Sequence, residues 1–139
     1  MTKVKTIELD KEKIMRQLIH SAKLMATGKW RLEYDRELDQ LFVGKKIIPK
    51  NAFLYGLNDE INIFVTPASN VNGLFIEYFA KNYIKHNKKL SPVLEALAKV
   101  KKKKDKEKED LAKEALEGKL VNEAITSVYG KKKLVAAIA

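Results

Sequence analysis

A chain of 139 residues is long enough to bury one hydrophobic core and too short for a second independent one. It contains no cysteine, which excludes disulfides, thiolate metal sites and cysteine nucleophiles, and with 45% hydrophobic and 33% charged residues it lies outside the composition of disordered chains. Because no stretch approaches the ~18 consecutive apolar residues of a membrane span, and the first residues lack the apolar run of a signal peptide, we expect a cytoplasmic protein that does not enter a membrane.

The formal net charge of +10 is the main indication of a partner, because a positive field attracts polyanions and speeds their encounter. Arginine supplies only three of the 28 basic residues, at positions 16, 31 and 36. Bidentate recognition of guanine or phosphate is mainly a property of arginine. The dominance of lysine therefore favours unspecific contact with a nucleic-acid backbone over sequence reading, with a merely solvated lysine surface as the alternative.

The N-terminal part predicts a capped amphipathic helix over residues 11–26. Asp10 is a suitable N-cap, and Gly28 favours a left-handed stop after the helix. Apolar residues recur at helical steps of three and four, at Ile14, Met15, Leu18, Ile19, Ala22 and Met25. His20 falls near this apolar stripe, where a lone histidine is more often packed or exposed than catalytic.

After this helix the apolar period changes to two residues, which is typical of a half-buried strand. The pattern predicts a strand from Trp30 to Asp35, a short turn and a second strand that ends at Val43. Gly44-Lys45-Lys46 then reverses the chain. Ile47-Ile48-Pro49 is a brief extended piece whose proline belongs at a sheet edge.

The next segment predicts a hairpin and then a strand that passes into a helix. Residues 53–56 and 61–66 have the composition of strands, and the turn-forming residues 57–60 separate them. After a longer loop, residues 74–76 complete the sheet and helical spacing begins at Phe79. A single helix over residues 74–87 is the alternative.

Two of these segments together resemble a known family. Tyr34-Asp35-x-Glu37-x-Asp39-x-Leu41-Phe42-Val43 and Gly73-Leu74-Phe75-Ile76-Glu77 are similar to the Tyr-Asp-x-Glu-x-Asp-x-Leu-Tyr-Ile opening and Gly-Ile-Glu-Ile close of a family of small bacterial and archaeal domains of unknown function. The resemblance covers residues 30–80, with an inserted segment at 50–60 and Phe-Ile-Glu in place of Ile-Glu. It implies a meandering sheet packed against a helix, and nothing catalytic.

From Ser91-Pro92, a typical helix opening, the sequence becomes helical and basic. Helical apolar spacing resumes at 111–116 and again at 120–128. Between these parts, residues 101–110 contain no apolar side chain and form either a solvated helix or a charged linker. Residues 131–139 are a basic cluster with an apolar tip, which we expect to dock on the chain's own core or on a partner.

Together these elements predict an α+β fold, in which an N-terminal helix packs on a small, mainly antiparallel sheet and a helical C-terminal extension follows. We expect residues 1–90 to form the core domain and residues 91–139 a basic helical extension. The interior of the core domain takes up its aromatic side chains, which leaves the lysine-rich end free to engage a partner.

The sequence offers few groups for catalysis, and we predict a protein that is not an enzyme and holds neither metal nor cofactor. It has no glycine-rich phosphate loop and no Gly-x-Ser-x-Gly elbow, and two histidines are too few for a metal-ligand set. Asp35, Glu37 and Asp39 could share one face of a strand and act on a cation or a proton. In a turn, however, Asp35 and Asp39 are better explained as acceptors for backbone amides. Glu77 is predicted to be exposed or paired, and a hydrolase that uses Asp35, Asp39 and Glu77 is a minor alternative.

Two functional hypotheses remain. The first is a non-catalytic binding or regulatory protein whose lysine clusters contact nucleic-acid phosphates unspecifically, with Trp30 or Arg31 stacking on bases. The second is a structural or assembly protein, such as a phage or mobile-element accessory factor, in which residues 91–139 bind another copy or another protein. The clusters of the first hypothesis are Lys101, Lys102, Lys103, Lys104, Lys131, Lys132 and Lys133.

Overall fold

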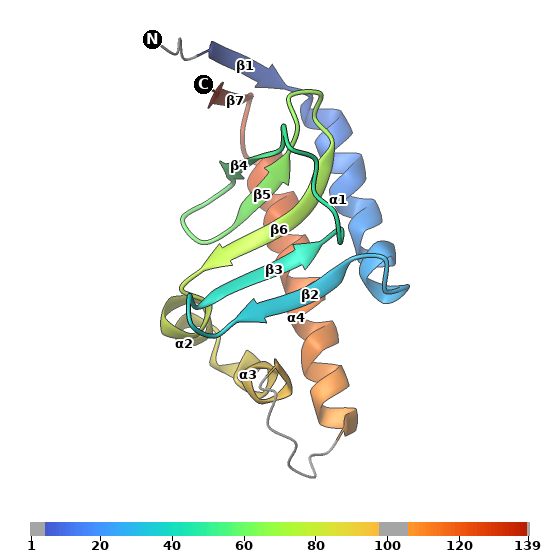
Figure 1. Cartoon of the computed structure of the whole chain (residues 1–139), viewed down its shortest axis with the longest axis vertical. Coiled ribbons are helices and arrows are strands. Elements are labelled where there is room, and N and C mark those ends of the chain that lie inside the picture. Colours follow the sequence, from blue (N-terminus) through green and yellow to red (C-terminus); the bar gives the residue numbers. More distant parts are fainter. Residues whose placement is uncertain (1–4, 98–105, 139) are drawn as a thin grey trace.

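The computed structural model describes residues 5–97 and 106–138, which form a five-stranded sheet, a two-stranded ribbon and a set of helices (Figure 1). The strands are β1 (Lys5–Leu9), β2 (Arg31–Asp35), β3 (Gln40–Gly44), β4 (Phe53–Gly56), β5 (Asn62–Val65), β6 (Val71–Glu77) and β7 (Leu134–Ile138). The helices are α1 (Lys11–Ala26), α2 (Ile84–His86), α3 (Pro92–Leu97) and α4 (Lys106–Tyr129), with a π-helical turn η1 (Phe79–Tyr83) and a 3-10 turn η2 (Lys88–Leu90). The predicted α+β class is confirmed.

The large sheet is antiparallel throughout and has the strand order β2-β3-β6-β5-β4. The hairpins β2–β3 and β4–β5 are joined through β6, which pairs with β3 on one side and with β5 on the other. Helices α1 and α4 pack against each other and lie behind the sheet in the view of Figure 1. The helices therefore cover one face of the sheet, and the opposite face is turned towards the viewer.

The core lies between the covered face of the sheet and these two helices. Alternate residues of β3, β5 and β6 are buried on that face: Leu41, Val43, Ile63, Val65, Leu74 and Ile76. The helices contribute Ile14 and Leu18 from α1, and Leu116, Leu120, Ala124 and Val128 from α4. Complete burial of each large aliphatic side chain stabilises the fold by roughly 1.5–3 kcal/mol, so this single layer supplies much of the favourable free energy.

The predicted N-terminal helix is confirmed with its caps. The carboxylate of Asp10 accepts a hydrogen bond from the backbone amide of Lys13 at 3.0 Å, which satisfies one of the donors left open at a helix start. Gly28 follows the helix with a φ of 74°, a conformation that suits glycine because it lacks a Cβ.

The sheet also follows the predicted pattern in most parts. The hairpins β2–β3 and β4–β5 form, and the strand β6 passes directly into the helical turns that begin at Phe79, which rules out a single helix over residues 74–87. Residues 47–49 differ, since they belong to the loop between β3 and β4 rather than to a strand. α3 begins at Pro92, as the Ser91-Pro92 pair predicted.

α4 differs from the two short helices that the sequence suggested, because it continues through Gly118 as one helix of 24 residues. A glycine inside a helix costs about 1 kcal/mol relative to alanine. Here Leu116 and Leu120 are both fully buried on either side of Gly118, and their burial exceeds that cost. The segment expected to be a basic extension therefore packs along α1 and shares the core of the residues that precede it.

The apolar C-terminal tip docks on the chain itself, through a pairing that the sequence did not indicate. β7 pairs with β1 in an antiparallel ribbon, with Leu9 opposite Leu134 and Lys5 opposite Ile138. Leu134 and Ala136 are buried, whereas Val135 between them is 49% exposed. The ribbon thus has one face on the core and one face in solvent. Among the described residues, no helix is both long and apolar enough to cross a bilayer.

We predict that Leu120→Ala lowers the free energy of unfolding by about 2–5 kcal/mol, because it leaves a cavity where α4 packs on the sheet. Leu111 lies on the same helix and is 64% exposed, so Leu111→Ala is the matched control, with an expected change within about 0.5 kcal/mol. Urea denaturation followed by circular dichroism measures both. A small effect of Leu120→Ala would show that α4 does not stabilise the core.

Candidate anion-binding site

A pocket of about 600 Å³ opens between the α2–η2 segment and α4. Four of its lining residues are lysines, and the described residues that line it include no carboxylate. Lysine therefore supplies the permanent charges among these residues, around a lining whose surface is mostly apolar. We call it the lysine pocket, and it is lined by Lys85, His86, Asn87, Lys88, Lys89, Leu90, Ala115 and Lys119.

The local fold directs these lysines outward. Tyr83 before the segment and Leu90 at its end are buried and fasten it to the core. Between them, the side-chain amide of Asn87 donates to the carbonyl of Tyr83 at 2.8 Å, and the carbonyl of Asn87 accepts from the amide of Leu90 at 2.8 Å. Because both ends are held in this way, the three lysines of the segment are exposed around the tight turn.

Among the described residues, no carboxylate forms an ion pair with Lys85, Lys88 or Lys89, whereas Lys119 is paired with Glu123 at 3.2 Å. Three of the four cations are thus available to an incoming anion. Lysine presents a compact charge with rotatable donors, and a cluster of such charges attracts phosphate without imposing a fixed geometry.

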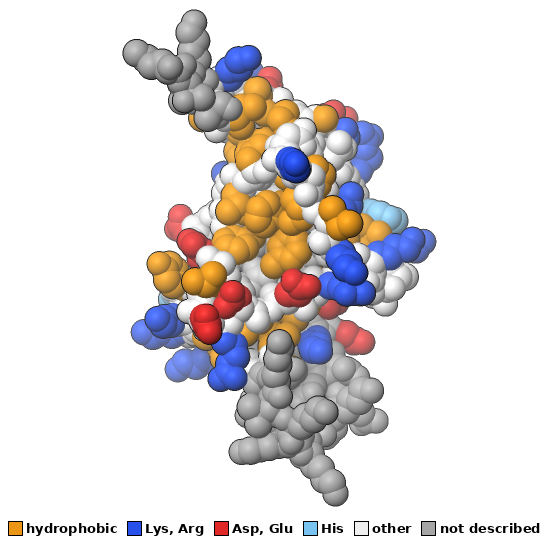
Figure 2. Space-filling view, in the orientation of Figure 1, with side chains coloured by type: hydrophobic (Ala, Val, Ile, Leu, Met, Phe, Trp, Pro, Cys, Tyr) orange, Lys and Arg blue, Asp and Glu red, His pale blue; other side chains and the backbone are white. Residues whose placement is uncertain are grey.

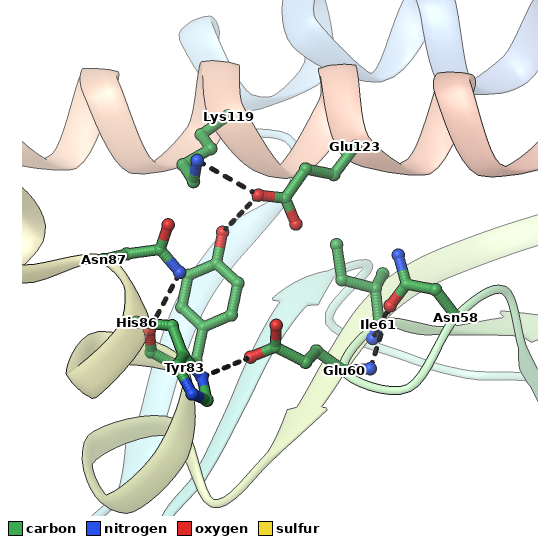
Figure 3. A network of polar contacts seen from close by, with 8 residues as sticks. All are labelled: Asn58, Glu60, Ile61, Tyr83, His86, Asn87, Lys119 and Glu123. Carbon is green, nitrogen blue, oxygen red and sulfur yellow. Dashed lines mark hydrogen bonds and ion pairs between the residues drawn. The ribbon is translucent and has the colours of Figure 1, made fainter.

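A polar cleft of about 420 Å³ adjoins the lysine pocket, and His86 and Asn87 line both. Figure 3 shows its network. The hydroxyl of Tyr83 donates to Glu123 Oε1 at 3.3 Å, and the same oxygen accepts from Lys119. Burial raises the pKa of Tyr83, and the charge and hydrogen bond of Glu123 raise it further. The phenol therefore stays protonated and acts as a donor.

The β4–β5 turn forms the opposite wall of this cleft. Asn58 Oδ1 accepts hydrogen bonds from the amides of Glu60 and Ile61, both at 2.8 Å, and its Nδ2 donates to Ser127 on α4 at 2.9 Å. These bonds tie the turn to α4 and direct Glu60 towards His86, whose Nδ1 lies 3.9 Å from Glu60 Oε2. The contact becomes an ion pair when the imidazole is protonated.

Asp39 is a buried structural anchor. Its side chain accepts hydrogen bonds from the Tyr34 hydroxyl at 2.6 Å and from the amides of Ala80 and Lys81 at 2.7 and 3.0 Å. Burial raises the pKa of Asp39, but these hydrogen bonds and the charge of Lys81 outweigh it, so the pKa lies below its ordinary value of 3.8. Burial and the bond to Asp39 raise the pKa of Tyr34 to about 12.

The other carboxylates of the minor hydrolase hypothesis have different surroundings. Asp35 accepts a hydrogen bond from the amide of Leu38 at 3.1 Å and so stabilises the β2–β3 turn. The interpretation of Asp35 as an acceptor that fixes the turn is confirmed, whereas the side chain of Asp39 accepts from backbone amides of η1 instead of its own turn. Glu77 was predicted to be either exposed or paired, and it is exposed at the end of β6. Glu37 is exposed in the turn.

Among the described residues, the predicted nucleic-acid contacts have separate surroundings. Trp30 is only 4% exposed and belongs to the core, so its ring is not presented for stacking on a base. Arg31 is exposed on β2. Lys132 and Lys133 are exposed between α4 and β7, while the backbone carbonyl of Lys131 accepts a hydrogen bond from Lys11. Lys101, Lys102, Lys103 and Lys104 lie outside the described residues.

The lysine pocket was not singled out from the sequence. Its first part was visible as the run Lys85-His86-Asn87-Lys88-Lys89, which is less dense in lysine than the clusters that were named. Lys119 gave no signal, because only the packing of α4 brings it to the same place, 30 residues further along the chain.

No protein-family model, curated protein or solved structure matches this chain. The resemblance to a family of small domains of unknown function therefore stays a prediction. Within residues 5–97 and 106–138, no group of three or more histidine or acidic side chains is placed to hold a metal ion.

We predict that Asp39→Asn lowers the free energy of unfolding at pH 7 by about 1–3 kcal/mol, the usual worth of hydrogen bonds to a charged group. Asparagine tolerates the φ of 53° at this position, so the substitution removes mainly the charge. Because the pKa of Asp39 is lower in the folded chain, its contribution is present above about pH 4 and is lost as the pH falls towards the folded-state value.

Urea denaturation of the natural chain and of the Asp39→Asn variant, at pH 7 and at pH 3, checks this linkage. The difference in unfolding free energy between the two proteins should shrink at the lower pH, because Asp39 of the unfolded natural chain is then largely protonated. A difference of the same size at both pH values would contradict the role of the charge.

Proposed function

We propose that this protein is a non-catalytic binding protein that contacts the phosphate groups of nucleic acid through the lysine pocket. The observation that carries the proposal is the convergence of Lys85, Lys88 and Lys89 with Lys119 around one pocket whose described lining has no carboxylate. Clustered cations that neutralise phosphates release the condensed counterions of a nucleic acid, and this release drives binding.

The charge of the whole chain supports the same class of ligand. A formal net charge of +10 draws a polyanion towards the surface from every side. The lysine pocket then offers a recess where several cations meet the same short stretch of backbone. Because the pocket contains lysine and no arginine, contact with phosphate is unspecific with respect to base sequence.

The polar cleft beside the pocket limits how the ligand lies. Glu60 and Glu123 repel phosphates, so a backbone that enters the lysine pocket leaves it away from the cleft. Sugar hydroxyls or base edges, which carry no charge, can instead face these carboxylates and Asn58 as hydrogen-bond donors and acceptors. A flexible single strand adapts to this geometry more easily than a duplex does.

Association through residues 91–139 is the second proposal, and the structure supports it less. The apolar stripe of α4 already has an intramolecular partner, since Leu116, Leu120 and Val128 are fully buried in the chain's own core. Among the described side chains of α4, the large apolar ones that stay exposed are Leu111 and Tyr129, near its two ends.

We predict that the full chain binds an unstructured single-stranded oligonucleotide at low salt and that the affinity falls steeply as salt rises. Replacing Lys85, Lys88 and Lys89 together by alanine should weaken binding and reduce the slope of log K against log salt by about 2, since each phosphate contact to a single strand accounts for about 0.7. Fluorescence anisotropy over a salt series measures both quantities.

The matched control replaces Lys131, Lys132 and Lys133 by alanine, which removes the same charge from another part of the surface. This control should keep most of the slope. Equal losses in the two variants would mean that net charge alone governs binding, and absence of binding at low salt would remove the proposal altogether.

A further inference from the structure

The open face of the large sheet has an apolar centre built from aromatic rings. Phe42, Phe64 and Phe75 project from β3, β5 and β6 and are partly exposed. Their rings pack edge to face, with centroids 5.6 Å apart for Phe42 and Phe64 and 5.9 Å apart for Phe64 and Phe75. Leu54, opposite Phe64 on the edge strand β4, is 46% exposed. Figure 2 shows this patch in orange at the middle of the visible face.

Two paired glycines leave room for the ring of Phe42 to lie flat on the sheet at this centre. Gly44 and Gly73 lie opposite each other in β3 and β6, and the ring of Phe42 lies over both. A Cβ atom on either glycine would stand 2.6 Å from that ring, so neither position accepts a side chain without displacing it. The result is a smooth apolar surface of the kind that packs against a second sheet.

Charges of opposite sign lie at the two ends of the strands that carry this patch. Arg31 begins β2, and Lys45 and Lys46 follow the end of β3 beside it. Glu33 comes two residues later on the same side of β2, and Glu77 ends β6 beyond it. All five are exposed. Figure 2 shows blue side chains to the right of the patch and red ones along its lower edge.

We propose that this face binds a second copy of the chain, sheet against sheet, about a two-fold axis that crosses the strands between Arg31 and Glu33. In such an interface every contact occurs twice. The rotation places Arg31 of each copy on Glu33 of the other and brings the lysines after β3 towards the Glu77 end. The phenylalanines of both copies then form one buried layer.

Charge complementarity selects this occupant over a nucleic acid. A strand that stacked its bases on the phenylalanines would carry its phosphates across Glu33 and Glu77, which repel them. A copy of the same chain, in contrast, meets Glu33 with Arg31 and brings the lysines after β3 towards Glu77. The surface lies on a different part of the fold from the lysine pocket, so the inference stands independently of the proposed function.

The test is a charge swap in the full chain, read by sedimentation equilibrium over concentrations that extend into the millimolar range. The natural chain should reach twice its mass of 15.9 kDa. Arg31→Glu and Glu33→Arg should each weaken the dimer by at least about tenfold, because each places like charges together at both symmetric contacts. The double variant, which exchanges the two residues, should restore the dissociation constant.

Both residues are exposed on one strand, so the fold of the variants is expected to persist, and circular dichroism verifies it. A monomer at every concentration overturns the inference. So do single variants that dimerise like the natural chain, or a double variant that stays as weak as the single ones, because both results place the contact elsewhere.

Discussion

The burial of only one face of the five-stranded sheet is the constraint on which the rest of this structure depends. The covered face carries the aliphatic residues of β3, β5 and β6, and these need a layer of helices to exclude water. α1 alone is too narrow to cover five strands, and α4 lies beside it to complete the layer. This placement also brings Lys119 to the α2–η2 segment, so the lysine pocket is a by-product of the packing of the core. The opposite face of the sheet carries the phenylalanines of β3, β5 and β6.

A single carboxylate joins the sheet to the segment that carries the pocket. Asp39 lies in the turn between β2 and β3 and accepts hydrogen bonds from the first amides of η1, while its own carbonyl accepts from the amide of Phe79. These donors point out of the start of a helical turn, where a negative charge is favourable. The direction in which the chain leaves β6 is therefore set by a side chain about 40 residues earlier.

Local patterns were enough to predict the elements that depend on local physics. Asp10 and Gly28 marked the ends of α1, and Pro92 marked the start of α3, because caps and proline act within one turn. The period-two pattern predicted the hairpins because the alternation of side chains along a strand is also a local property. The continuity of α4 could not be predicted in this way, since Gly118 is tolerated only because Leu116 and Leu120 are buried in a core that distant parts of the chain complete. Trp30 shows the converse error: an aromatic next to Arg31 resembled a stacking residue, and only the tertiary packing shows that it belongs to the core. The lysine pocket needed α4 and the α2–η2 segment to meet, and nothing in either stretch alone indicated that contact.

The ribbon of β1 and β7 has a consequence for how the chain acquires its structure. Its first pair joins Leu9 to Leu134, so the loop that it closes contains nearly the whole polypeptide. Bringing such distant strands together costs much chain entropy before the contacts between them can stabilise the ribbon. During synthesis α4, which completes the helical layer, emerges after every strand of the large sheet, and β1 has to wait without its neighbour until β7 emerges. The fold can thus be completed only when the last described residues have been translated, because both the helical layer and the ribbon depend on this end of the chain.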